Sequence, residues 1–210
     1  MSSKSIKTDK KSLAVLLFSA LLFLSGLFRL EPSLFGLPDN AVFSLGIQNM
    51  TAVCTGILLG GFQGAASVGL YILSGILLGF FGIPFFNTGV VSSETGMAYL
   101  QGAGGGFVFG YFLAAAAAGF LCGTVTDEKL SIKKLLKASC IAFILIYVSG
   151  IVQFLSVKGF TFSLQQIKLV FTAVILPYLP FDAVKVLLCV LAGRFLRPFI
   201  ARIFFLDSSL

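Results

Sequence analysis

The sequence contains no histidine and no tryptophan, and only 11% of its 210 residues are charged. A soluble chain has about 25% charged residues, so this chain has too little charge to cover a surface that faces water. With 58% hydrophobic residues and a mean hydropathy of +1.04, the composition indicates a membrane protein. Without tryptophan, an aromatic belt at the membrane interface would have to be built from the five tyrosines.

The missing histidine also removes most catalytic chemistry. It excludes Ser-His and Cys-His nucleophile pairs, histidine proton relays and histidine metal ligands. The four cysteines lie in apolar runs without a CxxC pair, which predicts small, buried, unreactive thiols; they are Cys54, Cys122, Cys140 and Cys189. We therefore expect no enzyme activity, no metal and no cofactor.

The glycine-rich stretch 101–119, QGAGGGFVFGYFLAAAAAG, does not form a nucleotide-binding loop. The P-loop pattern needs a lysine, and no lysine occurs between Lys11 and Lys129. The dinucleotide pattern G-x-G-x-x-G needs a glycine at its sixth position. This position is Phe107 when counted from Gly102 and Phe109 when counted from Gly104. If the protein performs active transport, another protein must supply the energy.

The spacing of these small residues indicates packing instead. Gly102, Gly106, Gly110, Ala114 and Ala118 recur every four residues. Small residues at this spacing let helix backbones approach closely in lipid. The same device recurs in 60–79, so the sequence predicts a compact helical bundle.

Six apolar stretches are candidates for membrane spans, which need about 20 mostly apolar residues. They cover residues 13–28, 41–59, 62–81, 105–122, 135–157 and a last stretch within 169–205 that Pro177 and Pro180 interrupt. Because proline disturbs a helix interior, we expect a short approach segment and then a helix that begins near Pro180. The predicted fold is an all-α membrane protein with six transmembrane helices in 13–206, a basic cytoplasmic N-terminus in 1–12 and a tail in 207–210.

The basic residues predict the orientation of these spans. With the N-terminus inside, eleven lie on the cytoplasmic side: Lys4, Lys7, Lys10, Lys11, Lys129, Lys133, Lys134, Lys137, Arg194, Arg197 and Arg202. Three lie outside: Arg29, Lys158 and Lys168. This bias places both termini in the cytoplasm and the chain in the cytoplasmic membrane. The basic residues then face acidic lipids, so the net charge of +7 gives no reason to expect nucleic acid as a partner.

Asp182 and Lys185 are an ionisable pair inside a predicted span, three residues apart and on one helix face. Asp182 precedes Arg194 by about 18 Å of helix, in a hydrocarbon layer about 30 Å thick. At that depth the pair should line a cavity open to the outside, since lipid contact would be costly. Two interpretations remain: the charges only neutralise each other, or they bind a ligand that carries a hydrogen-bond donor and an anionic group.

Two further polar segments fall near the outer side. Residues 82–104 form the longest predicted connection and combine amides with aromatic residues, which suits either a lid over a ligand or a solvated loop. Gln48 and its neighbour Asn49 lie within an apolar span. Buried amides more often join helices than contact ligands, and both roles stay open for Gln48.

Four segments together resemble one family. They are VFSLGIQNM (42–50), LYILSGILLGFFGIPFF (70–86), QGAGGGFVFGYFLAAAAAG (101–119) and LPYLPFDAVKVLL (176–188). In order and spacing they are similar to those of the BioY family, the biotin-specific substrate-binding (S) components of energy-coupling factor (ECF) transporters. The chain departs from the family pattern at Ala103 and Gly104 (Pro-Thr in the family), at Phe107 (Tyr) and at Phe181 (Gly).

The resemblance implies a six-helix bundle that captures biotin from the outer side, with no catalytic or metal site. It implies a transmembrane coupling subunit and ABC-type ATPases as partners within the lipid bilayer. Asp182 and Lys185 fall on the family's D-x-x-K, and Asn87 falls in the loop that helps to enclose the ligand. The expected ligand-binding residues are Asp182, Lys185, Asn87, Gln48, Phe86, Gln101, Gly105 and Phe107. The alternative is the same fold serving another small vitamin or a biotin precursor.

Overall fold

A computed structural model describes residues 3–30, 45–86, 94–126, 128–157, 159, 163–172, 176 and 178–206. These residues form helices and their connections, apart from two strands of two residues each. Strand β1 (Arg29–Leu30) pairs antiparallel with β2 (Leu45–Gly46), with Arg29 opposite Gly46. The prediction of an all-α protein is confirmed.

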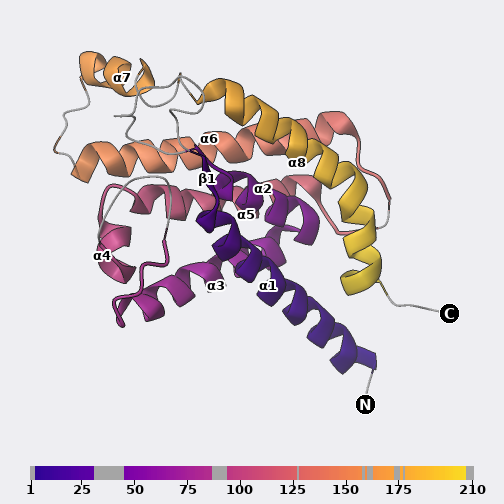
Figure 1. Cartoon of the computed structure of the whole chain (residues 1–210). Helices are drawn as coiled ribbons and strands as arrows, with labels where there is room; N and C mark the ends of the chain where they lie inside the picture. The colour runs from indigo at the N-terminus through magenta and orange to yellow at the C-terminus, as the bar shows by residue number, and fades with distance from the viewer. Residues whose placement is uncertain are drawn as a thin grey trace.

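The helices form one bundle (Figure 1). In chain order they are α1 (Ser3–Leu27), α2 (Gln48–Leu59), α3 (Gly61–Gly79), α4 (Gly96–Gln101), α5 (Gly105–Cys122), α6 (Ile132–Val157), α7 (Leu164–Val170) and α8 (Leu179–Ile200), which continues into the π-helical turn η3 (Ala201–Phe205).

Four of the six expected spans are long and apolar enough to cross a membrane within the described residues. They are Asp9–Leu27, Gly61–Gly79, Gly105–Cys122 and Ile132–Val157. The other two differ for separate reasons. Helix α2 has 12 residues, which is about 18 Å, whereas α8 has 22 residues but includes four charged side chains.

The helix boundaries depart from the sequence prediction at three places. Helix α1 begins at Ser3, so the basic N-terminal residues continue the first helix instead of preceding it. The connection predicted in 82–104 contains the short helix α4. Helix α8 begins at Leu179, one residue before Pro180, which confirms the predicted start, because proline is tolerated in the first turn of a helix.

Helix α5 is the central element of the bundle. It contacts α2, α3, α4 and α6, and 61% of its residues are buried against 33% in each of the other three long apolar helices. Gly110 faces α6 so closely that a Cβ atom there would lie 2.8 Å from the Cα atom of Ile146. Gly106 meets the backbone of Ser149 on the same helix in the same way. The packing seam predicted from the four-residue spacing is therefore confirmed.

A second row of small residues on α5 faces the turn between α2 and α3. Gly119 lies against the backbone of Gly60 and Gly61, and Ala115 lies against Gly56. A Cβ atom on Gly64 would approach the Cα atom of Gly56 to 2.7 Å. Small residues thus let three helices meet at backbone distance, as in other membrane bundles.

The C-terminus of α5 is closed by an arginine from α8. The Arg197 side chain is 1% exposed. Its guanidinium donates hydrogen bonds to the carbonyls of Cys122 (3.3 Å), Gly123 (2.6 Å) and Thr124 (2.8 Å). The last carbonyls of a helix have no partners within the helix, and a cation there also suits the negative end of the helix dipole. Arg197, which the sequence predicts on the cytoplasmic side, is thus a buried helix cap.

The outer faces of the bundle carry large apolar side chains. Examples are Leu16, Leu17, Leu21 and Leu24 on α1, and Leu187, Leu188, Leu191 and Phe195 on α8, all between 45% and 60% exposed. A soluble monomer rarely exposes apolar surface on this scale. The faces of these helices therefore suit contact with lipid.

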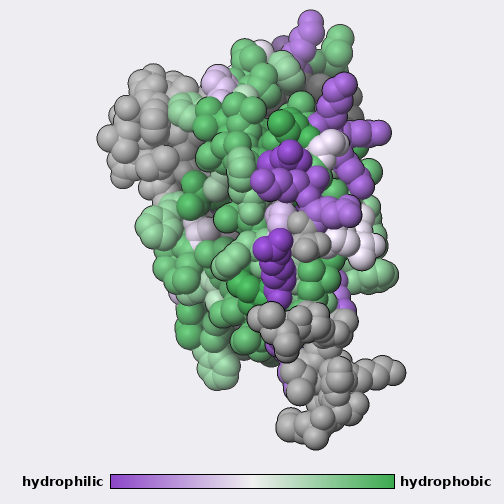
Figure 2. Space-filling view, turned by 90° about the vertical axis from the view of Figure 1, so that its right-hand side faces the viewer, coloured by the Kyte–Doolittle hydropathy of each residue, from purple (hydrophilic) through white to green (hydrophobic). Residues whose placement is uncertain are grey.

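The two ends of the bundle differ in charge. One end, here called the basic end, holds the chain termini, the α2–α3 turn, the α5–α6 connection and η3 (Figure 1). The basic residues at this end whose side chains are described, Arg197 aside, are Lys10, Lys11, Lys129, Lys133, Lys134, Lys137, Arg194 and Arg202. Figure 2 looks onto this end and shows hydrophilic residues gathered beside a broad hydrophobic area. Helices α4 and α7 lie at the opposite end.

Candidate binding site around Asp182

Asp182 lies in the first turn of α8 and is 5% exposed. A carboxylate in this position interacts favourably with the positive end of the helix dipole. Burial of an ionised carboxylate is costly unless other groups neutralise it and donate hydrogen bonds to it. The surroundings of Asp182 provide both.

Three side chains from three helices contact the Asp182 carboxylate. The Lys185 ammonium lies 2.9 Å from Oδ1, which confirms the contact predicted from the three-residue spacing. Asn49 on α2 donates from Nδ2 to the same oxygen over 3.4 Å. The Tyr147 hydroxyl on α6 donates to Oδ2. Asp182 is thus a junction of α2, α6 and α8.

Asn49 and Tyr147 are absent from the residues predicted for the site. Asn49 was visible in the sequence as the neighbour of Gln48, but nothing local indicated which amide faces Asp182. Tyr147 stands in an otherwise apolar stretch of α6, and that isolated polar group was the available signal. Only the packing of α6 against α8 shows that it reaches a carboxylate 35 residues away.

Most tyrosines of the chain lie in the core of the bundle. Tyr71, Tyr99, Tyr111 and Tyr178 belong to one buried cluster and are at most 6% exposed, and Tyr147 bonds Asp182. The four tyrosines of the cluster therefore lie in the interior and not in a belt at the membrane interface.

Gln48 joins three helices. It is 2% exposed, and its Nε2 donates to the carbonyl of Leu22 on α1 (3.0 Å) and to the hydroxyl of Tyr71 on α3 (2.9 Å). This is the helix-joining role that the sequence favoured. Its Oε1 is buried and has no hydrogen-bond partner among the described residues. An unsatisfied buried acceptor costs about 1–3 kcal/mol, so this oxygen can still accept a hydrogen bond from a ligand.

Phe86 belongs to an aromatic cluster beside Gln48. Its ring centroid lies 5.7 Å from that of Tyr71 and 5.6 Å from that of Tyr99. Phe85 completes the cluster, 5.2 Å from Tyr71 and stacked on Phe23 at 4.5 Å. The cluster forms an apolar wall that reaches the tyrosine hydroxyls.

The remaining predicted residues lie around the start of α5. Gln101 is exposed at the end of α4. Gly105 lies against the carbonyl of Leu100, where a Cβ atom would overlap. Phe107 is 6% exposed and packs on Gly150 of α6. Phe86 and Phe107 share one buried cluster with four tyrosines, whereas Gln101 is exposed and does not belong to that cluster. Asn87 lies outside the described residues.

A glutamine on α6 fixes the α4–α5 junction. Gln153 donates from Nε2 to the carbonyls of Leu100 (2.6 Å) and Gly102 (2.8 Å). Helix α6 therefore holds the glycine-rich segment that the sequence placed beside a ligand.

These features define a class: a multi-pass helical membrane protein with one buried polar junction and lipid-facing sides. The family model of the BioY family matches residues 1–202. The chain belongs to the BioY family.

A solved structure has the same fold. A crystal structure at 2.1 Å of the S component for biotin from an ECF-type ABC transporter is 21% identical to the chain, with a TM-score of 0.67. The similarity covers 94% of each chain. A comparison with curated protein sequences found no match.

Proposed function

We propose that the protein captures biotin at the outer face of the cytoplasmic membrane and carries it inward, as the substrate-binding component of an ECF-type transporter. The observation that carries this proposal is the buried Asp182–Lys185 pair in a chain that belongs to the BioY family. The fold shared with an S component for biotin supports it further.

The chemistry of the junction suits biotin. A lysine ammonium binds a carboxylate, and biotin has a valerate carboxylate. The ureido ring of biotin has N–H donors, which suit the Asp182 carboxylate and the unsatisfied Oε1 of Gln48. Its apolar ring suits the wall formed by Phe86 and Phe107. Asn87, Gln101 and Gly105 also belong to the proposed site.

Ligand binding would replace contacts that the free protein makes with itself. Lys185 and Asn49 both contact Oδ1 of Asp182, and each can turn toward a ligand by a change of side-chain rotamer. The Tyr147 hydroxyl contacts the other oxygen and can hold the carboxylate meanwhile. The Asp182–Lys185 pair is therefore preorganised for a ligand, while the side chains around it can still change rotamer to bind one.

The proposed topology has six membrane segments with both termini in the cytoplasm. Segment 41–59 and helix α8 are the other two, beside the four apolar spans. Helix α8 can cross the membrane because its charges at Asp182, Lys185 and Arg197 all have partners within the bundle. The basic end then faces the cytoplasm, and the ligand cavity opens at the opposite end.

The proposed partners are a transmembrane coupling subunit and ABC-type ATPases. The sequence contains no P-loop, so ATP hydrolysis must come from other chains. Copurification of ATPase subunits with the tagged protein from its own membranes would support this part of the proposal. A protein that accumulates biotin in cells without any such subunits would contradict it.

The ligand is tested by thermal unfolding of the purified protein in detergent with biotin, desthiobiotin, lipoate or riboflavin. A ligand at 100 times its Kd stabilises the folded state by about 2.7 kcal/mol, so biotin should raise Tm clearly. The variant Lys185→Met should remove the shift, whereas Lys129→Ala, at an exposed residue of the basic end, should keep it. A response to another compound and not to biotin would favour the alternative of a different small vitamin or precursor.

A further inference from the structure

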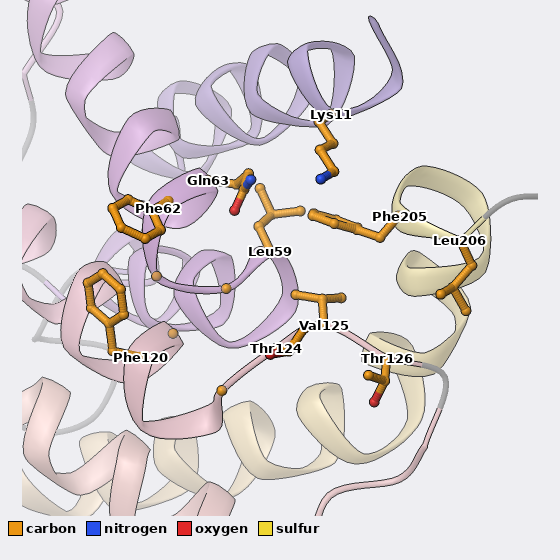
Figure 3. A pocket seen from close by; sticks show the side chains of 14 residues that line it. Lys11, Leu59, Phe62, Gln63, Phe120, Thr124, Val125, Thr126, Phe205 and Leu206 are labelled. Carbon is orange, nitrogen blue, oxygen red and sulfur yellow. The ribbon is translucent and has the colours of Figure 1, made fainter. Parts of the chain in front are cut away.

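A cavity lies at the basic end, opposite to the proposed biotin site. Its volume is about 630 Å³, within the range of roughly 300–1,000 Å³ that is usual for ligand pockets. It lies between four elements: the N-terminal part of α1 around Lys11, the α2–α3 turn, the C-terminal end of α5 and η3 (Figure 3). No part of the proposed transport mechanism uses it.

Glycines keep this cavity open. Gly60, Gly61, Gly119 and Gly123 line it. Gly60 and Gly123 have φ values of +83° and +79°, a conformation that other residues rarely adopt. Larger side chains at these two positions would both strain the backbone and fill the space. The hollow is therefore built into the two helix ends.

The walls are largely apolar and open toward the lipid-facing side. Leu59 and Val125 form buried parts of the wall. Phe62 and Phe120 stand at the rim, 77% and 57% exposed, with their rings in an edge contact at 5.1 Å. Two exposed phenylalanines beside a hollow are suited to contact with an acyl chain.

Positive charge stands over the same cavity. The Lys11 ammonium lies 5.7 Å from the centroid of the Phe205 ring, and Figure 3 shows Lys11, Gln63 and Phe205 turned toward one space. Lys134 does not itself line the cavity, but its ammonium lies 3.6 Å from the position that a Cβ atom would take on Gly123, which does line it. The described carboxylates of this end, Asp9 and Glu128, are exposed residues that do not line the cavity.

We infer that this cavity binds one acidic phospholipid, of the phosphatidylglycerol kind. Its phosphate lies by Lys11 and Lys134, where the charges are complementary. One acyl chain lies against the exposed sides of Phe62 and Phe120, continuous with the apolar sides of the bundle. Gln63, Thr124 and Thr126 line the same cavity and offer hydrogen bonds to the glycerol hydroxyls. The lipid thereby joins α1 to η3 at the basic end.

The test uses the full-length protein in nanodiscs of equal parts phosphatidylglycerol and phosphatidylcholine with identical acyl chains, followed by native mass spectrometry after release. The expected result is one retained phosphatidylglycerol in preference to phosphatidylcholine. Lys11→Ala should lower its retention about fivefold, the effect of one basic residue at an acidic membrane surface, and Lys11→Arg should restore it.

Lys129→Ala is the matched control, because Lys129 also lies 5.7 Å from a phenylalanine ring at the basic end, that of Phe195, but does not line the cavity. It should leave retention unchanged. Competition separates the sources of the phosphate: short-chain phosphatidylglycerol should displace the bound lipid, and inorganic phosphate alone should not.

Equal retention of the two lipids, or equal losses in Lys11→Ala and Lys129→Ala, would overturn the proposal. Displacement by inorganic phosphate would show an anion site without lipid selectivity and would overturn it as well. The proposal would also be overturned if no lipid were retained and a copurified protein chain protected Lys11 from acetylation. None of these readouts depends on biotin, so the proposed transport function stands or falls separately.

Discussion

Helix α8 carries two buried charged side chains that are held in opposite ways. Asp182 in its first turn contacts only side chains, from Lys185, Asn49 and Tyr147. Arg197, about 22 Å further along the helix, contacts only backbone carbonyls at the end of α5. Both residues are at most 5% exposed.

The difference separates a binding site from a structural cap. Backbone carbonyls at a helix end cannot turn away, and without Arg197 the buried carbonyl of Cys122 would lose this donor. Side-chain partners can exchange one acceptor for another, so a ligand can compete for them. Two buried charges on one helix therefore predict two different kinds of mutant.

The largest expected effect is on folding, at Arg197. Arg197→Met should lower the free energy of unfolding by about 3 kcal/mol, because three carbonyls lose a charged donor and that of Cys122 is buried. Thermal unfolding in detergent measures it. Arg194→Met is the control, since Arg194 bonds the carbonyls of Lys129 and Leu130 from a less buried position; equal losses in the two variants would contradict the role of Arg197 as a buried cap.

The next effect is on binding, at Asp182. Asp182→Asn keeps the shape of the side chain but removes the charge that Lys185 contacts. We expect the affinity for biotin to fall by about 2–3 kcal/mol, or roughly 30- to 150-fold, and Tm of the free protein to fall less than in Arg197→Met. Titration calorimetry measures the affinity. If the variant unfolded like Arg197→Met and bound biotin normally when folded, the contrast between the two residues would be lost.

A smaller effect is expected at Tyr147. Tyr147→Phe removes one hydrogen bond to the carboxylate, which should weaken biotin binding by about 1.5 kcal/mol, or roughly tenfold. The matched control is Ser149→Ala on the same helix, which loses a 2.7 Å hydrogen bond to the carbonyl of Gly106 without touching Asp182. Ser149→Ala should change stability and leave the affinity alone; the reverse pattern would show that Tyr147 acts only in packing.

The smallest effect is a chemical one between α2 and α8. The Cys54 and Cys189 sulfurs lie 3.4 Å apart, so mild oxidation should join them with little movement toward the roughly 2.05 Å of a disulfide. Mass spectrometry after maleimide labelling should count two free thiols in place of four, and biotin affinity should change by less than about twofold. The variant Cys54→Ala should keep all of its thiols; loss of the exposed Cys140 instead would show a different packing.

Much of the fold follows from local sequence. The apolar runs predicted the long helices, with α5 matched at both of its ends, because hydrophobic length and small-residue spacing act within one segment. The contact of Asp182 with Lys185 was also predictable, since three residues on a helix fix it. The position of α4 was missed, because a helix of six residues is too short to show a helical repeat in the sequence.

The surroundings of Asp182 were not predictable in the same way. Asn49 lies 133 residues from Asp182 in the chain, and nothing local indicates that α2 and α8 meet. Gln48 was assigned to the ligand and also joins α1 to α3, because the side of α2 that each amide occupies depends on how three helices pack. The interior position of the tyrosines likewise depends on how the helices pack, which no single segment indicates.

The sequence by itself determined a membrane protein of the BioY type, the long apolar helices, the glycine seam of α5 and the ion pair on α8. These features depend on the transfer of apolar side chains out of water and on the spacing of residues along a single helix. Only the tertiary structure decided that Tyr147 and Asn49 hold Asp182, and that Arg197 closes α5. Those contacts join segments far apart in the chain, and they form only after the bundle has brought the helices together.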